Sequence, residues 1–333
     1  MNISDIARMA GVSKGTVSRV INDSPEGVSE ETRKRIKKMI EDVGYIPNRV
    51  AGSITHARTG TIGIIIPDIQ NFFFPQVVKG IEDCARSHGY TVFLGNSESD
   101  IKNEERYLRT FIEKRVDGIV LNTCGEITDK KLLNSLGVSR IPIVLMDRKS
   151  ESFPNVPGIY VDNRSAACEG VGYLLRSGLK RIAYLGGNDQ LYTSRERYRG
   201  YVMALEKAGV PVEPDLVLHG DYSIASGIEM INRLSSRLGE IDGIFAGSDM
   251  TAIGVIKALR ERNIRVPEDI QVLGFDNIEM SDVLTPALTT MSQPMYEIGS
   301  HAMQKLLDIF DEKEDCMQSE YLHAVLIRRE TTG

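Results

Sequence analysis

Residues 4–23, SDIARMAGVSKGTVSRVIND, decide the architecture of the amino-terminal part of the chain. The apolar side chains of residues 3–10 recur at helical spacing, and Asn2 stands where a helix-capping residue is preferred. Gly11 follows, and glycine adopts the left-handed conformation that ends a helix at little cost. Ser13 can then cap a second helix that turns its valines inward. Two short helices joined by a glycine-containing turn are typical of a helix-turn-helix.

A third helix is predicted between Ser29 and Gly44. Ser29 is a favourable capping residue, and the glutamates that follow it suit the positive end of the helix dipole. Ile36, Ile40 and Val43 form its apolar stripe, and its other face is rich in Lys and Arg. A three-helix packing module without a DNA contact would have the same spacing, so spacing alone leaves both possibilities open.

The charge is distributed unevenly along the chain. The 333 residues have a formal net charge of −6, but residues 1–59 hold ten Lys/Arg and seven Asp/Glu. A basic segment attached to an acidic remainder favours contact with a polyanion such as DNA. A helix fits the major groove, where Lys and Arg donate hydrogen bonds to guanine. We therefore expect the second helix to bind DNA.

Length and composition limit the remaining possibilities. The length predicts about two domains, and the apolar content of 41% excludes wholesale disorder. No apolar run approaches the roughly 20 residues of a membrane helix, and the amino end lacks an apolar signal-peptide core. We therefore expect a soluble, cytoplasmic protein. We also expect no metal or cofactor, because the cysteines and histidines show no metal-ligand spacing. These residues are Cys84, Cys124, Cys168 and Cys316, and His56, His88, His219, His301 and His323.

From residue 61 onward the pattern predicts an α/β body. Short β-branched runs alternate with amphipathic helical stretches, which indicates parallel sheets covered on both faces. RVDGIVLN at 115–122 leads to IPIVLMD at 141–147, and EIDGIFAG at 240–247 leads to IQVLGFD at 270–276. This repeated pattern predicts two related lobes that are joined by several short crossings and hold a ligand between them.

Polar and aromatic residues follow the predicted strands, where parallel sheets bind ligands. Carboxylates and an arginine can pair with hydroxyl groups, and aromatic faces can pack on the C–H side of a sugar ring, so we expect a polyol site. For Asp249, capping of the next helix explains the position equally well, and core packing does so for Phe72, Phe73 and Phe74. The strand-end residues are Asn71, Phe73, Phe74, Asp147, Arg148, Ser248, Asp249, Asp276 and Asn277.

The whole chain resembles the LacI–GalR (lactose repressor/galactose repressor) family of bacterial transcription regulators. The motifs that carry the resemblance are SDIARMAGVSKGTVSRVIND, VSEETRKRIKKMIEDVGYIPNRVAGSI at 28–54, GFDN at 274–277 and TPALTTMSQP at 285–294. The resemblance implies a homodimer that binds a pseudo-palindromic double-stranded DNA operator and responds to a small molecule, with no catalytic reaction. It implies a DNA-binding domain at 1–47, a hinge at 48–60 and an effector-binding and dimerisation domain at 61–333. The N-lobe would span about 61–160 plus 292–322, and the C-lobe about 161–291 plus 323–333.

The resemblance also assigns residues of the DNA interface. It assigns the base contacts to Lys14, Gly15 and Arg19. It assigns the phosphate contacts to Ser13, Thr16 and Ser18. The hinge includes Asn48 and Ile54, and in the family it becomes helical on the operator and inserts an apolar side chain into the minor groove. Gly52 and the β-branched Ile54 form helices less readily than the residues usual there.

The body resembles sugar-binding periplasmic proteins, and MDR at 146–148 and FD at 275–276 are similar to ribose-type binders. Phe72 replaces a proline that is common in the family. Helical geometry separates Arg197 from Arg195 and Arg199, which share another face. The implied effector contacts are Asn71, Phe73, Phe74, Asp147, Arg148, Arg197, Tyr222, Ser248, Asp276 and Gln293.

Two alternatives remain open. QPMYEIGSHAM at 293–303 resembles the segment with which some relatives bind a phosphorylated carrier protein, so a surface around Tyr296, Ser300 and Met303 would make the protein a global regulator of carbon use. A sugar-binding protein that no longer binds DNA is the second alternative. Nucleotide-binding and nucleophile motifs are absent, and no feature pairs two carboxylates as acid and base, so we expect no enzyme.

Overall fold

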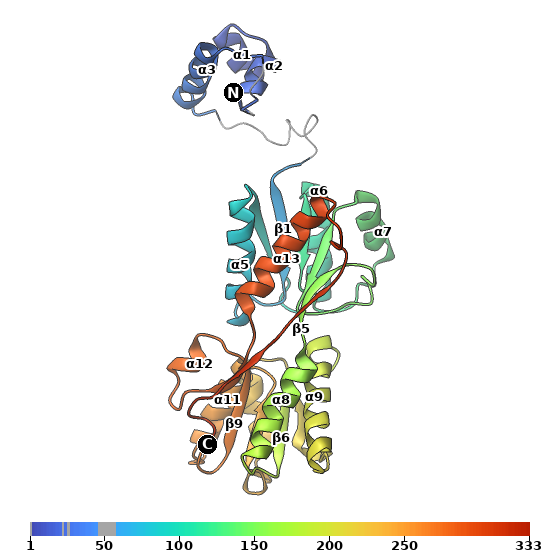
Figure 1. Cartoon of the computed structure of the whole chain (residues 1–333), viewed down its shortest axis with the longest axis vertical. Helices are drawn as coiled ribbons and strands as arrows, with labels where there is room; N and C mark the ends of the chain where they lie inside the picture. Colours follow the sequence, from blue (N-terminus) through green and yellow to red (C-terminus); the bar gives the residue numbers. More distant parts are fainter. Residues whose placement is uncertain (1, 22, 25–26, 46–57) are drawn as a thin grey trace. The chain divides into compact units, whose positions relative to one another are not determined.

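The computed structural model describes residues 2–21, 23–24, 27–45 and 58–333. The chain forms two compact units, the head (Met1–Thr59) and the body (Gly60–Gly333), which are shown in Figure 1 and described separately. In the described ranges, no helix is long and apolar enough to cross a membrane.

The head contains the three predicted helices. Asn2 and Asp5 exchange reciprocal capping hydrogen bonds, and Gly11 ends the first helix with φ of 63°. The Ser13 hydroxyl accepts a hydrogen bond from the backbone N–H of Thr16 at 3.1 Å. The Ser29 side chain accepts one from the backbone N–H of Thr32 and so caps the third helix. The helices are α1 (Ile3–Ala10), α2 (Lys14–Ile21) and α3 (Glu30–Asp42). Local capping chemistry therefore determines where each helix of the head begins.

A small apolar core joins these helices. Ile6 of α1, Val17 of α2 and Ile36 of α3 are fully buried against one another. The Arg35 side chain donates a hydrogen bond to the carbonyl of Ala10 at 3.1 Å, which ties α3 to the end of α1. The packing leaves one face of α2 exposed.

The body contains two six-stranded sheets with the same order of strands. The first has the order β11-β5-β4-β3-β1-β2 and the second β12-β10-β9-β8-β6-β7, so the predicted relation between the halves is confirmed. The first sheet comprises β1 (Thr61–Ile66), β2 (Thr91–Asn96), β3 (Gly118–Leu121), β4 (Ile143–Met146), β5 (Gly158–Val161) and β11 (Glu320–Leu322). The second comprises β6 (Ile182–Gly186), β7 (Val217–His219), β8 (Gly243–Ala246), β9 (Gln271–Asp276), β10 (Thr289–Ser292) and β12 (Val325–Ile327).

The sheets depart from the expected pattern at their edges. All pairs are parallel except β10 with β12, which is antiparallel. The prediction that every strand is covered on both faces is wrong for β2, where Phe93 is 46% and Leu94 40% exposed. The strand lies at the sheet edge beside β1, and edge strands keep one side open. Strands β7, β11 and β12 have only three residues each, too few for a clear periodic signal.

Helices cover both faces of each sheet. In the first lobe, α5 and α13 pack together on one face, and α6 and α7 on the other; in the second, α8 packs with α9 and α10 with α11. These helices are α5 (Phe73–Ser87), α6 (Ile101–Lys114), α7 (Lys130–Ser139), α8 (Asn163–Arg176), α9 (Tyr192–Ala208), α10 (Ile224–Arg233), α11 (Asp249–Arg260) and α13 (Met295–Phe310), with the short α12 (Met280–Val283) after β9.

Within residues 58–333 the chain crosses three times between the lobes, after β5, β10 and β11 (Figure 1). Val161 ends β5 in the first sheet, and Ser292 ends β10 in the second, so each of these crossings begins where the strand's hydrogen-bonded ladder ends.

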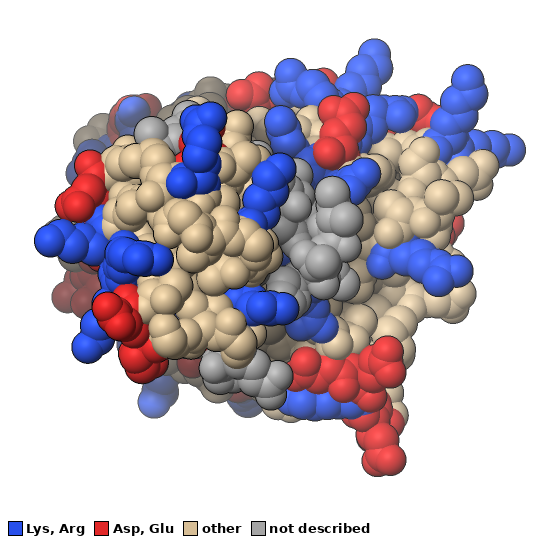
Figure 2. Space-filling model, turned by 90° about the horizontal axis from the view of Figure 1, so that it is seen from above, with Lys and Arg blue, Asp and Glu red and all other residues tan. Residues whose placement is uncertain are grey.

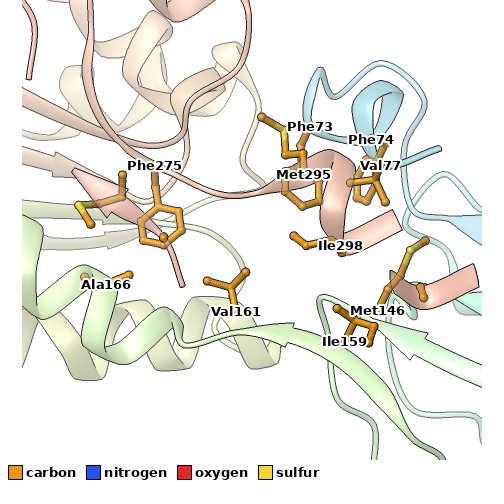
Figure 3. Packing of buried hydrophobic residues seen from close by; sticks show 14 of the residues in the cluster. Phe73, Phe74, Val77, Met146, Ile159, Val161, Ala166, Phe275, Met295 and Ile298 are labelled. Atoms are coloured by element: carbon orange, nitrogen blue, oxygen red, sulfur yellow. The ribbon is translucent and has the colours of Figure 1, made fainter. Parts of the chain in front are cut away.

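Apolar packing is continuous through the crossings. One buried cluster contains Phe275 and Ala166 of the second lobe together with Met146 and Ile298 of the first. Figure 3 shows Val161, at the end of β5, between these two groups. The lobes therefore share apolar core at their junction.

Candidate functional site

A cavity lies between the lobes. It collects side chains from the carboxyl ends of strands in both sheets, as expected for parallel α/β folds. Its lining consists of Asn71, Phe73, Phe74, Asp147, Arg148, Thr193, Arg197, Tyr222, Ser248, Asp276 and Gln293. All ten residues predicted as effector contacts are thus brought together. Thr193 was missed, although it precedes Arg197 by one helical turn on α9, a spacing that places both on one face.

Phe73 and Phe74 form the aromatic wall of the first lobe. Their rings meet edge to face, with centroids 5.1 Å apart and an interplanar angle of 87°, and both are buried. The Asn71 side-chain oxygen accepts the backbone N–H of Phe73 at 3.0 Å, which fixes the start of α5. Phe72 is 49% exposed and lies outside the cavity lining, so it is not part of the aromatic wall. Figure 3 shows Phe73 beside Met295.

Asp147 and Arg148 follow β4 and complete this wall. The Asp147 carboxylate accepts a hydrogen bond from Asn122 Nδ2 at 3.2 Å, and its other oxygen stays unpaired. Arg148 Nη1 donates to the carbonyl of Thr123 at 3.2 Å. Both side chains are buried, so charged groups are presented to the cavity with little solvent around them.

Arg197 is the anchored cation of the second lobe. Its Nε donates to Asn163 Oδ1 at 2.7 Å and its Nη1 to the carbonyl of Gly247 at 2.5 Å. Its guanidinium carbon lies 3.8 Å from the centroid of the Phe275 ring. Arg197 is only 4% exposed, whereas Arg195 is exposed, so the structure distinguishes the two as the helical spacing predicted.

Asp276 faces Arg197 across 3.6 Å. Burial raises the pKa of its carboxyl group to about 8, although the Arg197 guanidinium opposes this shift. Gln293 Nε2 donates to Asp276 Oδ1 at 2.6 Å, which links the carboxyl group to the crossing after β10.

The backbone at three cavity residues adopts left-handed conformations. Asp147 has φ of 61°, Tyr222 of 64° and Asp276 of 125°. Such conformations cost non-glycine residues free energy and collect at sites where side chains must be aimed precisely.

Buried polar atoms without partners also collect here. Among the described residues, the buried side-chain atoms that lack a hydrogen bond are Asn122 Oδ1, Asp147 Oδ1, Arg148 Nε, Tyr222 OH and Gln293 Oε1. Four of these belong to the cavity lining, and Asn122 contacts Asp147. The atoms include donors and acceptors, so a ligand that both donates and accepts hydrogen bonds complements them.

Ser248 and Asp249 have different roles. Ser248 lines the cavity, and its hydroxyl caps α11. Asp249 lies outside the lining and accepts hydrogen bonds from Ser281 and Thr290 at 2.6 Å each. Both expectations for Asp249 are therefore wrong: it does not line the cavity, and Ser248 rather than Asp249 caps α11, whereas Asp249 tethers neighbouring segments.

The predicted DNA-contacting residues of the head lie together on α2 and its preceding turn. Ser13, Lys14, Gly15 and Arg19 are exposed, and Thr16 and Ser18 are half-buried. The Ser13 hydroxyl is also bonded to that of Thr16 at 2.9 Å. Within the described part of the chain, neither Lys14 nor Arg19 forms an ion pair. Lys and Arg side chains are prominent on the face seen in Figure 2. Asn48, Gly52 and Ile54 lie outside the described residues.

Two family models match the chain. The model for bacterial regulatory proteins of the lacI family matches residues 2–48. The model for periplasmic binding proteins and the sugar binding domain of the LacI family matches residues 59–328. The chain belongs to the LacI family. It is a transcription regulator with a DNA-binding head and a sugar-responsive body.

Individual LacI-family members resemble the chain over its full length. Catabolite control protein A of Priestia megaterium is 37% identical over 334 residues, covering 99% of both chains. The ribose operon repressor of Halalkalibacterium halodurans is 34% identical over 332 residues, covering 99% of this chain and 97% of the repressor. A crystal structure of the lac repressor dimer bound to operator and an anti-inducer superposes with a TM-score of 0.87 at 25% identity, covering 99% of this chain and 98% of that one.

The segment expected to bind a carrier protein in some LacI-family members lies mainly in α13. Tyr296 is 41% exposed, and its hydroxyl donates to the Asp83 carboxylate at 3.3 Å. Met303 is fully buried, because the middle of α13 packs between α5 and the sheet. The expectation that Met303 belongs to a docking surface is therefore wrong, whereas Tyr296 and the half-buried Ser300 retain exposed surface.

Proposed function

We propose that the cavity binds a neutral monosaccharide, a ribose-like pentose or a hexose, and that this ligand controls the affinity of the head for its operator. The observation that carries the proposal is the cluster of unpaired buried polar atoms around the cavity. Each such atom costs about 1–3 kcal/mol when left unpaired, so a polyol that bonds to several of them is stabilised by the site.

The pairing of the cavity's charged side chains favours a ligand without a charge of its own. Arg148 lies 3.7 Å from the Asp147 carboxyl group and Arg197 lies 3.6 Å from that of Asp276, so each guanidinium already faces an acidic partner. A phosphorylated sugar would need an excess of cationic side chains.

Each group has a proposed role. Phe73 and Phe74 pack against the C–H face of the ring, and the remaining polar side chains bond to its hydroxyl groups. These polar contacts are Asn71, Asp147, Arg148, Thr193, Arg197, Tyr222, Ser248, Asp276 and Gln293.

In the head, Lys14, Gly15 and Arg19 approach base edges, and Ser13, Thr16 and Ser18 bind phosphates. Asn48 and Ile54 belong to a hinge at 48–60 that inserts into the minor groove. LacI-family regulators bind operators as dimers, and a two-fold dimer matches a pseudo-palindromic site. The effector acts by binding more tightly to one arrangement of the lobes than to another. We place this regulator in the cytoplasm with no catalytic step.

Titration calorimetry tests the effector. The purified protein is titrated with ribose, xylose, glucose and galactose, and footprinting on genomic fragments is repeated with each sugar. Binding of one sugar, with a change in operator protection, supports the proposal. Absence of heat with every sugar contradicts the proposed ligand class.

A second candidate function is control by a phosphorylated carrier protein. The exposed Tyr296 of α13 and the 37% identity to catabolite control protein A favour it. Co-purification of the full chain with the phosphorylated carrier, and its loss in Tyr296→Ala, would support this function. Operator binding that responds to a sugar alone would reject it.

A further inference from the structure

Lys149, the residue after Arg148, lies among three tyrosine rings. Its Nζ is 5.2 Å from the ring centroid of Tyr160, 5.5 Å from that of Tyr192 and 5.0 Å from that of Tyr321. The ammonium group also donates a hydrogen bond to the Tyr321 hydroxyl. All three distances fall within the roughly 6 Å over which a cation is attracted to an aromatic face.

These four side chains come from both lobes. Lys149 follows β4, Tyr160 belongs to β5 and Tyr321 to β11, so these three belong to the first lobe. Tyr192 is the first residue of α9 in the second lobe, and its ring centroid lies 6.4 Å from that of Tyr160. The ammonium and the Tyr160 ring therefore contact the other lobe through Tyr192.

The cluster is continuous with the cavity. Arg148 and Thr193, which line the cavity, are the chain neighbours of Lys149 and Tyr192. Burial alone would lower the pKa of Lys149, but the Tyr321 hydrogen bond and the nearby Tyr192 and Glu196 raise it overall, so the amine stays charged. A movement that separated Thr193 from Arg148 would also pull Tyr192 away from Lys149.

We propose that Lys149, Tyr160, Tyr192 and Tyr321 form a clasp that stabilises the closed arrangement of the lobes and thereby tunes effector affinity. The proposal deepens the proposed function, on which its ligand-binding part rests. Any interaction that favours the binding-competent arrangement raises the apparent affinity of a ligand that requires it. None of the four clasp residues lines the cavity, so their variants change lobe closure and leave the cavity's own side-chain hydrogen bonds in place.

A fluorescence experiment tests the clasp without any ligand. The chain contains no tryptophan, so Tyr192→Trp introduces a single reporter, and tryptophan is the ring that binds cations best. Adding Lys149→Met should shift the Trp emission to longer wavelength as the lobes open, whereas Lys149→Arg should leave it unchanged. Lys131→Met, at an exposed lysine of the same lobe, is the matched control. Unchanged emission in Lys149→Met, with parental thermal unfolding, overturns the clasp.

Calorimetry with the sugar that binds the parent protein measures the functional effect. Tyr192→Leu and Lys149→Met should each weaken binding by about 3- to 30-fold, the range expected for a cation–π contact. Tyr192→Phe and Lys149→Arg should restore affinity to within about 2-fold, since ring and charge are kept. Parental affinity in both loss variants contradicts the clasp. If no sugar binds the parent, the proposed function fails, whereas the emission result still decides the clasp.

Discussion

The head and the body place their functional side chains in opposite ways. The predicted DNA contacts of the described head come from a single turn and helix, residues 13–19, and several are exposed. The cavity of the body collects residues from 71 to 293, and most of them are buried. A local motif requires only that its helix forms, whereas a buried site requires that two sheets and their crossings form together. DNA binding and effector binding should therefore be separable by mutation.

The largest expected effect is in the body. Arg197→Ala removes a guanidinium that bonds to Asn163 and Gly247 and faces Asp276. Removing one partner of a buried, hydrogen-bonded charge pair at a binding site costs about 2–5 kcal/mol of binding free energy, so effector binding should fall at least about 30-fold in calorimetry. Operator affinity without effector should stay within about 2-fold in gel shifts.

Arg195→Ala is the matched control, because Arg195 is exposed on the same helix. Equal losses of effector binding in the two variants would show that the buried position of Arg197 gives it no special role in the site.

The next largest effect is in the head. Lys14→Ala and Arg19→Ala should each weaken specific operator binding by about 1–3 kcal/mol, because each loses hydrogen bonds to bases. Footprinting should show reduced discrimination between operator and unrelated DNA, while effector heats stay unchanged. Lys34→Ala, at an exposed lysine of α3, should have a smaller effect. Operator protection as complete as that of the parent in both variants would reject α2 as the recognition helix.

A smaller effect concerns the origin of head stability. Asn2→Ala removes the reciprocal cap with Asp5, and the loss of an N-cap costs about 1 kcal/mol. Because the head has a small core, amide hydrogen exchange in residues 3–10 should accelerate several-fold. Exchange in the body should not change. Faster exchange in both units would show that the head and the body unfold together and are not independent.

The last effect concerns the pH dependence of stability. Asp276 has a pKa of about 8 in the folded protein against 3.8 for an ordinary aspartate, so the folded state binds more protons between these values. The free energy of unfolding should therefore fall as pH rises from about 4 to about 8. Asp276→Asn should flatten this fall in urea denaturation, whereas Asp189→Asn, at an exposed aspartate, should not. An unchanged slope in Asp276→Asn would show that its carboxyl group is ionised throughout.

Expectations from sequence succeeded where short-range chemistry decides the structure and failed where distant segments meet. The bounds of α1 follow from Asn2 and Gly11, which act within one helical turn of its ends. Met303 and Phe93 could not be placed in this way, because packing of α13 and the position of β2 at a sheet edge set their exposure. No local pattern distinguishes a buried methionine from an exposed one.

The sequence by itself determined the helix-turn-helix, the paired strands of the two lobes and the cavity residues that follow strands, because caps, periodicity and strand ends are encoded by neighbouring residues. Arg197, Tyr222 and Gln293 were expected in the cavity only from the family resemblance. Only the tertiary structure decided that Thr193 joins the cavity, that Asp249 tethers α11, and that Lys149 lies among three tyrosines. It also decided the raised pKa of Asp276. Each of these depends on burial and on contacts between residues far apart in the chain, and such contacts exist only after the sheets have packed.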